Sequence, residues 1–218
     1  MIIKIFINLS ILFFIFSSIS FGITKSEIIE KIQEFHKNTQ DIKADFTQES
    51  FIKSINNTSI LKGDVYFKKG GMMLWDYQKP DPKKIISDGK ILWIYSPLDS
   101  QVIVSQLEKA FNTKIPVNFL QGIGELSKDF HSSLKKSRDK NYHELELIPK
   151  KPDISIKKVE LLVSKGNFQI ENICLYDQFG NYNRIIFENL KINQNLKNDI
   201  FLFEIPEGVE VINIKDLR

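Results

Sequence analysis

The chain has 218 residues, a net charge of +3 with acidic and basic residues interspersed, and a single cysteine. The balanced charge gives little support to nucleic-acid binding, so we expect no nucleic-acid partner. One cysteine excludes an intramolecular disulfide, and the fold must be stabilised by burial of apolar side chains, of which seventeen phenylalanines are a large supply.

The first 22 residues have the pattern of a secretory signal peptide. Lys4 supplies the positive charge, residues 5–16 supply the apolar core, and Ser20-Phe21-Gly22 form a cleavage site with small residues. The core is short for a transmembrane span, although a retained membrane anchor is the alternative. No cysteine lies near the cleavage point, which excludes a lipid-modified N-terminus. We therefore expect a soluble exported protein, localised to the periplasm, with one domain over residues 23–218.

The first part of that domain is predicted to be one helix followed by strands. Thr24-Lys25-Ser26-Glu27 form a capping box, and apolar residues at helical spacing follow through Phe35. From Asp41 the pattern changes to period two, with turns at Asn56-Asn57 and Gly70-Gly71. The expected strands cover residues 41–52, 61–69, 72–78, 85–86, 91–95 and 102–104.

The hairpin around Asp88-Gly89 is the strongest signal in the chain. Asp-Gly between two apolar runs predicts a type I′ turn, in which both central residues have positive φ. The outgoing strand is apolar on both faces, with Leu92 and Ile94 on one and Trp93 on the other. Such a strand needs cover on each side.

The second half is predicted to be a helical insert and further strands. Residues 106–134 have broken helical spacing weakened by Gly122 and Gly124, which indicates either a movable cover or an ordinary helix that plugs the sheet. Strands are expected over residues 143–148, 155–164, 168–176, 182–192 and 201–203. About ten strands without βαβ alternation predict a mainly β fold with some α, namely a curled, unclosed antiparallel β-barrel whose helices cover a concave apolar side.

Residue patterns for catalysis or metal binding are absent from the sequence. The three histidines, His36, His131 and His143, have no metal-ligand spacing, and no nucleophile elbow, Walker loop or dinucleotide fingerprint occurs. Cys174 lies in a strand pattern and is interpreted as a buried apolar residue. We expect no enzyme activity, no metal and no cofactor, and a curled sheet that holds an apolar ligand.

The central hairpin resembles the signature of the LolA family of periplasmic outer-membrane lipoprotein carriers. The resemblance covers essentially the whole mature chain, and the central hairpin is its most specific part. The matching residues are Ser87-Asp88-Gly89-Lys90, Leu92-Trp93, Tyr95, Pro97 and Gln101-Val102, with Phe46-Thr47-Gln48, Gly63-Asp64, Trp75, Pro80, residues 112–120, Phe187-Glu188-Asn189, Phe203, Pro206, Gly208 and Val209 in the family's order.

The resemblance implies a monomeric carrier that takes triacylated lipoproteins from an inner-membrane ABC transporter to an outer-membrane receptor. It also implies an unclosed barrel, lidded by helices, around a hydrophobic cavity. The residues expected to line that cavity are Phe46, Val65, Phe67, Met73, Trp75, Leu92, Trp93 and Ile94. The lid and its contacts are expected at Lys69, Phe119, Leu120 and Ile123.

One position departs from the family pattern. Members commonly have Lys-Arg-Pro where this chain has Lys68-Lys69-Gly70, and the arginine is thought to hydrogen-bond the lid shut. Lysine keeps the charge but loses the planar fork of donors. The resemblance therefore implies a lid held more weakly or by other contacts.

Four other functions stay open at this point. A protein of the same fold could carry a different exported lipid or glycolipid, or sense lipoproteins as a regulator domain. The outer-membrane receptor shares the fold but needs a lipidated cysteine, which this chain lacks near the cleavage point. An esterase with an unrecognised site and a purely structural envelope protein are the remaining alternatives.

Overall fold

The computed structural model describes residues 23–108, 126–137, 139–152 and 155–214. Its first element is the helix α1 (Lys25–Asn38), which begins at the predicted capping box. The Thr24 hydroxyl accepts a hydrogen bond from the Glu27 amide at 3.3 Å, and the Glu27 carboxylate accepts one from the Thr24 amide at 2.7 Å. Ile28, Ile29 and Ile32 form the buried stripe of the helix.

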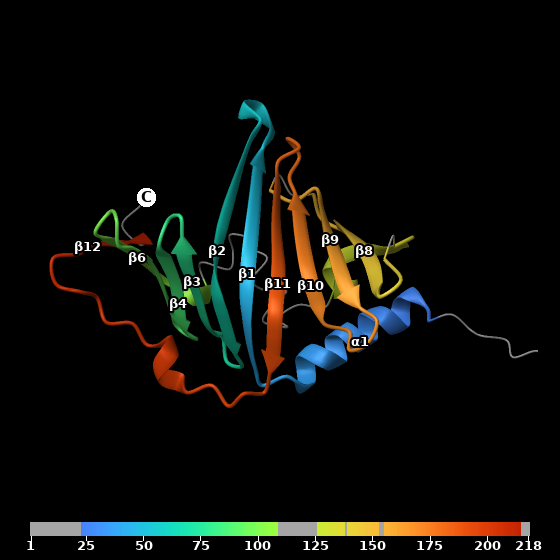
Figure 1. The fold of residues 1–218 in the computed structure, drawn as a ribbon, viewed down its shortest axis with the longest axis horizontal. Helices are drawn as coiled ribbons and strands as arrows, with labels where there is room; N and C mark the ends of the chain where they lie inside the picture. Colours follow the sequence, from blue (N-terminus) through green and yellow to red (C-terminus); the bar gives the residue numbers. More distant parts are fainter. Residues whose placement is uncertain (1–22, 109–125, 138, 153–154, 215–218) are drawn as a thin grey trace, which may run out of the picture.

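One twelve-stranded sheet makes up most of the remaining described chain (Figure 1). Its strands are β1 (Asp41–Ile52), β2 (Asn57–Lys68), β3 (Met72–Lys79), β4 (Lys83–Asp88), β5 (Ile91–Ser96), β6 (Gln101–Gln106), β7 (Phe130–Lys135), β8 (Tyr142–Pro149), β9 (Lys158–Ser164), β10 (Ile170–Tyr176), β11 (Tyr182–Ile192) and β12 (Glu210–Asn213). The order across the sheet is β12-β6-β5-β4-β3-β2-β1-β11-β10-β9-β8-β7. All neighbouring pairs are antiparallel except β12 with β6, which is parallel.

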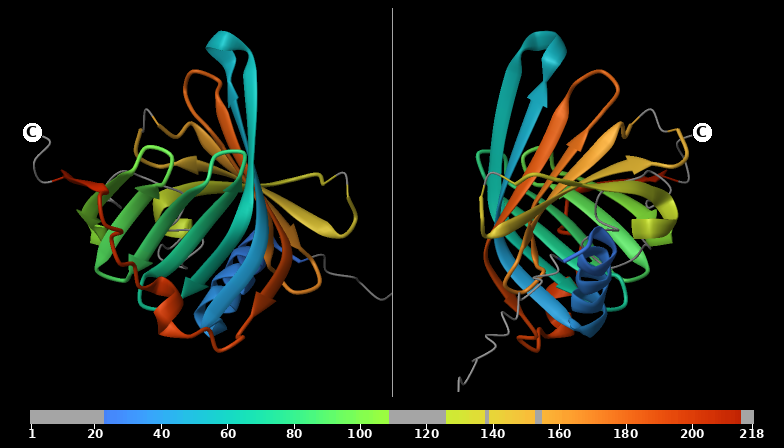
Figure 2. Two further views of the ribbon diagram at one scale, coloured as in Figure 1. Left: turned by 60° about the vertical axis from the view of Figure 1, so that its left-hand side comes forward. Right: turned by 90° about the vertical axis from the view of Figure 1, so that its right-hand side faces the viewer.

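The sheet curls but does not close, because β7 and β12 are its two edges and each pairs with a single described strand. Helix α1 lies within the curve, against the inner face (Figure 2). The C-terminal segment, with the short 3-10 helix η2 (Asn198–Phe201), runs along the outer face of β3 and β4. The predicted fold class, an unclosed antiparallel barrel with helical cover, is therefore confirmed, with twelve strands instead of about ten.

The strand register places apolar residues in rows across the inner face. One row runs from Ala44 on β1 through Val65, Trp75 and Ile85 to Ile94 on β5. A second row contains Ile42, Phe67, Met73, Ser87 and Leu92. These rows pack with the buried stripe of α1 in one apolar core.

The outer face of β3 to β6 carries a second apolar layer. Ile86, Val102 and Phe201 are each at most 2 % exposed, and the ring of Phe203 lies 5.3 Å from that of Tyr95. The strand predicted over residues 201–203 is wrong: the 3-10 helix η2 ends at Phe201, and the terminal strand is β12. Phe201 and Phe203 instead anchor a covering segment, which provides the second cover that strand 91–95 requires.

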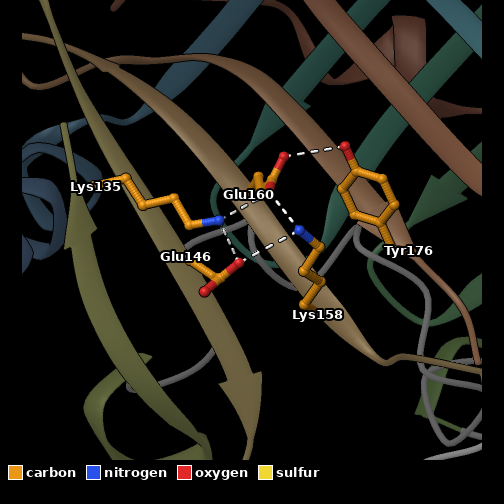
Figure 3. A network of polar contacts seen from close by, with 5 residues as sticks. All are labelled: Lys135, Glu146, Lys158, Glu160 and Tyr176. Atoms are coloured by element: carbon orange, nitrogen blue, oxygen red, sulfur yellow. Dashed lines mark hydrogen bonds and ion pairs between the residues drawn. The ribbon is translucent and has the colours of Figure 1, made fainter. Parts of the chain in front are cut away.

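The outer face of β7 to β10 is charged instead of apolar (Figure 3). Lys158 forms ion pairs with Glu160 at 2.6 Å and with Glu146 at 3.3 Å, and Lys135 also pairs with both carboxylates. The Tyr176 hydroxyl donates to Glu160 at 3.0 Å. Hydrogen bonds from Lys135 and Lys158 hold the pKa of the Glu146 carboxyl below its usual value. This half of the sheet therefore faces water without a covering segment among the described residues.

Two local predictions are wrong. Residues 130–134 were expected to be helical, but the helix α4 (Leu126–Asp129) ends before them and Phe130–Lys135 form β7. The turn at Asp88-Gly89 is not type I′, because Gly89 has φ 97° whereas Asp88 has no positive φ. The Asp88 carboxylate instead accepts hydrogen bonds from the amides of Lys90 and Ile91, both at 2.8 Å.

Candidate functional site

An aromatic cluster forms the centre of the inner face. The ring of Phe46 lies 4.9 Å from that of Trp75 and 4.9 Å from that of Tyr77, both edge-on. Phe67 meets Trp75 edge-on at 5.6 Å, and Phe187 approaches it from β11 at 6.3 Å. Such edge-to-face pairs orient the rings in addition to burying them. The cluster is a continuous apolar surface across β1, β2, β3 and β11.

Six of the eight predicted cavity residues, Leu92 among them, belong to this sealed part of the inner face. Phe46, Val65, Phe67, Met73 and Trp75 are each at most 4 % exposed. The Trp75 indole nitrogen is shielded from solvent and has no hydrogen-bond partner in the described chain.

Toward β6 the same face becomes accessible. Leu92 is buried, but Ile85, Ile94 and Ile103, which are opposite one another on β4, β5 and β6, are only half-buried. Ile85 and Ile103 were not among the predicted site residues. The hairpin pattern could have found them, because pairing around the 88–89 turn places Ile85 opposite Ile94. An apolar ligand would meet this row of isoleucines first.

Trp93 does not belong to the inner face, and its assignment to the cavity is corrected. It pairs with Ile86 and Val104, and its ring lies 6.2 Å from Phe203 of the C-terminal segment. The reason is the two-residue period of a strand, which places Trp93 on the face opposite Leu92 and Ile94. Trp93 therefore packs in the outer apolar layer.

Polar groups mark the limit of the apolar surface near the β1–β2 hairpin. The Tyr77 hydroxyl donates to the Gln48 side-chain oxygen at 2.8 Å, and the Gln48 amide donates to the Ser50 hydroxyl at 3.3 Å. Burial raises the pKa of Tyr77 to about 12, so its hydroxyl remains a neutral donor at physiological pH. Gln48 thus has a structural role at the border of the aromatic cluster.

Adjacent lysines fasten the two covers of the sheet. The Lys69 ammonium donates to the backbone carbonyl of Lys37, in the last turn of α1, at 2.7 Å. The Lys68 ammonium points to the other side and donates to the carbonyl of Leu196 and to the Asn198 side chain. Lys69 therefore holds the inner cover and Lys68 the outer one.

The end of α1 is not packed tightly on its neighbours. A hollow of about 240 Å3 opens beside it, lined among others by Phe35, Thr39, Phe168 and Ile192. In the same turn of the helix, the Nε2 atom of His36 is shielded from solvent without a hydrogen-bond partner in the described chain, and burial lowers the pKa of His36 to about 4. The hydrogen bond from Lys69 is one of the contacts that attach the C-terminal turn of the helix.

The remaining predicted lid residues, Phe119, Leu120 and Ile123, lie outside the described residues. The contact between Lys69 and this segment therefore stays a prediction. Lys69 itself is exposed and bonded to α1, so the cover that it holds among the described residues is the N-terminal helix.

Among the described residues, few side chains or helices are suited to catalysis, metal binding or membrane insertion. Cys174 is buried as predicted, and burial raises the pKa of its thiol, which disfavours the nucleophilic thiolate. Within residues 23–108 and the later described ranges, no cluster of three metal-ligating side chains is found. None of the helices described there is both long enough and apolar enough to cross a membrane.

Comparisons with known proteins identify the family. The family model "Outer membrane lipoprotein carrier protein LolA" matches residues 37–204. Curated outer-membrane lipoprotein carrier proteins are similar over most of their length: 29 % identity with that of Nitrosospira multiformis, covering 92 % of this chain and 95 % of the relative, and 28 % with that of Methylobacillus flagellatus, covering 86 % and 90 %.

Solved structures support the fold. An uncharacterised conserved protein from Thermus thermophilus superposes with a TM-score of 0.58 at 15 % identity, covering 86 % of this chain and 98 % of that one. A chain of the Pseudomonas aeruginosa MucA/MucB complex gives 0.50 at 14 % identity, covering 82 % of this chain and 60 % of that one. The family match spans well over half of the sequence, so the chain belongs to the LolA family of outer-membrane lipoprotein carrier proteins.

Proposed function

We propose that this protein carries acylated lipoproteins and shields their acyl chains on the inner face of its curled sheet. The observation that supports this most is the row of half-buried isoleucines, Ile85, Ile94 and Ile103, which continues the sealed aromatic cluster to an accessible part of the face. A domain that buried all of its apolar surface for stability alone would not need such a continuation.

The energetics of lipid transfer explain why a carrier is required. Anchoring gains about 0.8 kcal/mol per buried methylene, so three acyl chains with about 45 methylenes amount to roughly 35 kcal/mol as an upper limit. A free lipoprotein cannot cross water against that cost. The inner face would replace the bilayer during transit, and Met73 suits variable chains because a thioether side chain is flexible.

In this proposal the protein acts in the periplasm as a monomer without catalysis. It receives triacylated lipoproteins from an inner-membrane ABC transporter and passes them to an outer-membrane receptor. Binding would need movement of a cover, since Phe46 and Trp75 are sealed in this structure. Among the described residues, the cover that would move is helix α1, whose last turn is bonded to Lys69.

The test is purification of the exported protein from periplasm followed by mass spectrometry of what accompanies it. We expect acylated lipoproteins with the wild type and at least a tenfold reduction with Ile94→Asp, because a carboxylate on the accessible row opposes hydrocarbon. The matched control is Glu144→Gln in β8, a charge change away from the inner row. Recovery of a glycolipid instead would assign the other cargo, and recovery of no lipid would reject the carrier function.

A further inference from the structure

Two hairpin tips project together from one end of the sheet, beyond the rest of the molecule (Figure 2). One is the β1–β2 tip, with the short helix η1 (Lys53–Ile55), and the other is the β10–β11 tip at residues 177–181. The Lys53 amide donates to the Asn181 side-chain oxygen at 2.9 Å, and the rings of Phe51 and Tyr182 stack at 5.3 Å. The tips therefore form one unit, which we call the paired tip.

The backbone of the paired tip is fixed by its own hydrogen bonds. The Asp177 carboxylate accepts from the amides of Phe179 and Asn181 at 2.8 and 2.9 Å and from the Asn181 side chain at 2.6 Å. Asn56 has φ 46° and closes the other turn. Local hydrogen bonds and the contact between the two hairpins together fix the backbone of the paired tip.

The side chains held outward are large and apolar. Phe179 is 71 % exposed and Ile55 66 % exposed, with Ile60 and Ile52 at 52 and 44 % on the strands just behind them. Ile55 and Phe179, at the ends of the two joined hairpins, form a small apolar patch, whereas the strand register places Ile52 and Ile60 on opposite faces of the β1–β2 hairpin. The inner-face core contains none of these four, so the patch is separate from the surface proposed for acyl chains.

The strands and loops that lead to the paired tip carry lysines. Lys53 in η1 and Lys157, whose amide donates to the Tyr176 carbonyl beside the β10–β11 tip, are exposed, and neither forms an ion pair with an acidic side chain of the described chain. The acidic groups there are occupied: Asp177 bonds its own turn, and Glu49 pairs with Arg184 at 3.7 Å. The paired tip is therefore an apolar end flanked by lysines that have no acidic partner.

We propose that the paired tip docks on an anionic lipid membrane, with Phe179 and Ile55 entering the interface and the lysines near the headgroups. A projecting apolar end surrounded by cations matches a soft anionic surface, into which a few side chains insert while lysines meet lipid phosphates. A convex tip offers no groove to a peptide or helix. Contact through so few apolar residues is weak and reversible, which a protein that moves between membranes requires.

Vesicle binding by the exported protein tests the proposal. Flotation with vesicles of phosphatidylethanolamine and phosphatidylglycerol should recover the wild type, with loss of binding at high salt and on pure phosphatidylcholine. The double variant Ile55→Ser/Phe179→Ser should bind at least fivefold less. The matched control Leu202→Ser/Ile205→Ser changes two exposed apolar residues away from the tip and should bind as the wild type does.

A second variant reports membrane contact by a positive fluorescence signal, so it tests the proposal even if the serine variants fold poorly. Tryptophan in the Phe179→Trp variant should shift its emission to the blue on anionic vesicles and not on phosphatidylcholine. Absence of that shift, or equal binding of the tip variant and the wild type, would overturn the proposal. Crosslinking from position 179 in cells that captures a protein and no lipid would also overturn it and would assign the tip to a protein partner.

This membrane contact does not depend on the proposed carrier function, and the two fail separately. Lipoproteins should still be recovered with Ile55→Ser/Phe179→Ser if the inner face binds cargo. If the exported wild-type protein binds vesicles but is recovered without lipoproteins, the carrier proposal is rejected and the membrane contact is not.

Discussion

The inner and outer faces of β3 to β6 are both apolar, yet they are covered in different ways. On the outer face, Phe201 and Phe203 of the continuous chain pack on the surface, which leaves Trp93, Tyr95 and Val104 half-buried, and Lys68 fastens that segment. On the inner face, the buried stripe of α1 joins the same apolar core as the aromatic cluster, whereas the isoleucine row on β4 to β6 stays half-buried. Half-buried apolar side chains therefore remain on both faces, and the faces differ in the cover that they have: the chain's own C-terminal segment on the outer face and α1 on the inner face.

The largest expected effect on stability comes from truncating a large buried side chain on either face. Phe201→Ala and Phe46→Ala should each lower the free energy of unfolding by about 3–5 kcal/mol, because both side chains are at most 2 % exposed. Urea denaturation measures the loss. At a temperature where both variants are folded, we expect reduced lipoprotein recovery with Phe46→Ala only. Equal recovery with the two variants would remove the functional distinction between the faces.

A smaller effect is expected from the pH dependence of the inner cover. Burial lowers the pKa of His36 to about 4, below its unfolded value near 6.5, so the folded state favours the neutral ring. Stability is therefore complete above pH 7 and falls as the pH drops from 6.5 toward 4, by roughly 1–3 kcal/mol. His143, whose pKa is also lowered, contributes with the same sign.

The variant His36→Leu separates these two contributions. Its unfolding free energy, measured by denaturation at pH 7 and pH 5, should fall clearly less than that of the wild type. An unchanged pH dependence would show that His36 is protonated in the folded protein without cost.

The two neighbouring lysines allow a direct comparison of the covers. Lys69→Leu removes the hydrogen bond to the Lys37 carbonyl and should destabilise by about 0.5–1.5 kcal/mol. It should also alter the rate of lipoprotein release to the receptor. Lys68→Leu removes bonds to the outer segment and should cost a similar amount without changing release. Unchanged transfer with Lys69→Leu would remove Lys69 from the mechanism.

The smallest effect is expected at the charged outer face of β7 to β10. Lys158→Met breaks ion pairs of partly exposed groups and should change stability by about 0–1 kcal/mol, less at high salt. Thermal unfolding at low and high salt measures it. A loss of several kcal/mol would mean that this network supports the sheet as strongly as the apolar layers do.

Several features of this fold could be predicted from local sequence. The capping box at Thr24 and Glu27 fixed the start of α1 because both partners lie within one turn. The alternation of side chains along the sequence predicted the strands. The same alternation places Trp93 on the face opposite Leu92 and Ile94. The error was to assign all apolar residues of one strand to a single cavity.

Other features could not be predicted because they depend on distant partners. Phe130 and Leu134 are four residues apart, a spacing that fits one face of either a helix or a strand, and pairing with β8 selected the strand. Phe201 and Phe203 alternate as strand residues do, but no strand edge is available to them on the outer face. Likewise, neither Lys53 nor Phe179 indicates in sequence that two hairpin tips meet.

The most direct test compares the two adjacent positions 93 and 94, whose side chains point to opposite faces. A photo-crosslinking benzoylphenylalanine is placed at Ile94 or at Trp93, and the protein is irradiated in cells that produce lipoproteins. The account predicts crosslinks to acylated lipoproteins from position 94 and contacts within the chain, with no lipoprotein, from position 93. Lipoprotein crosslinks from position 93, or none from position 94, would contradict an acyl-binding inner face.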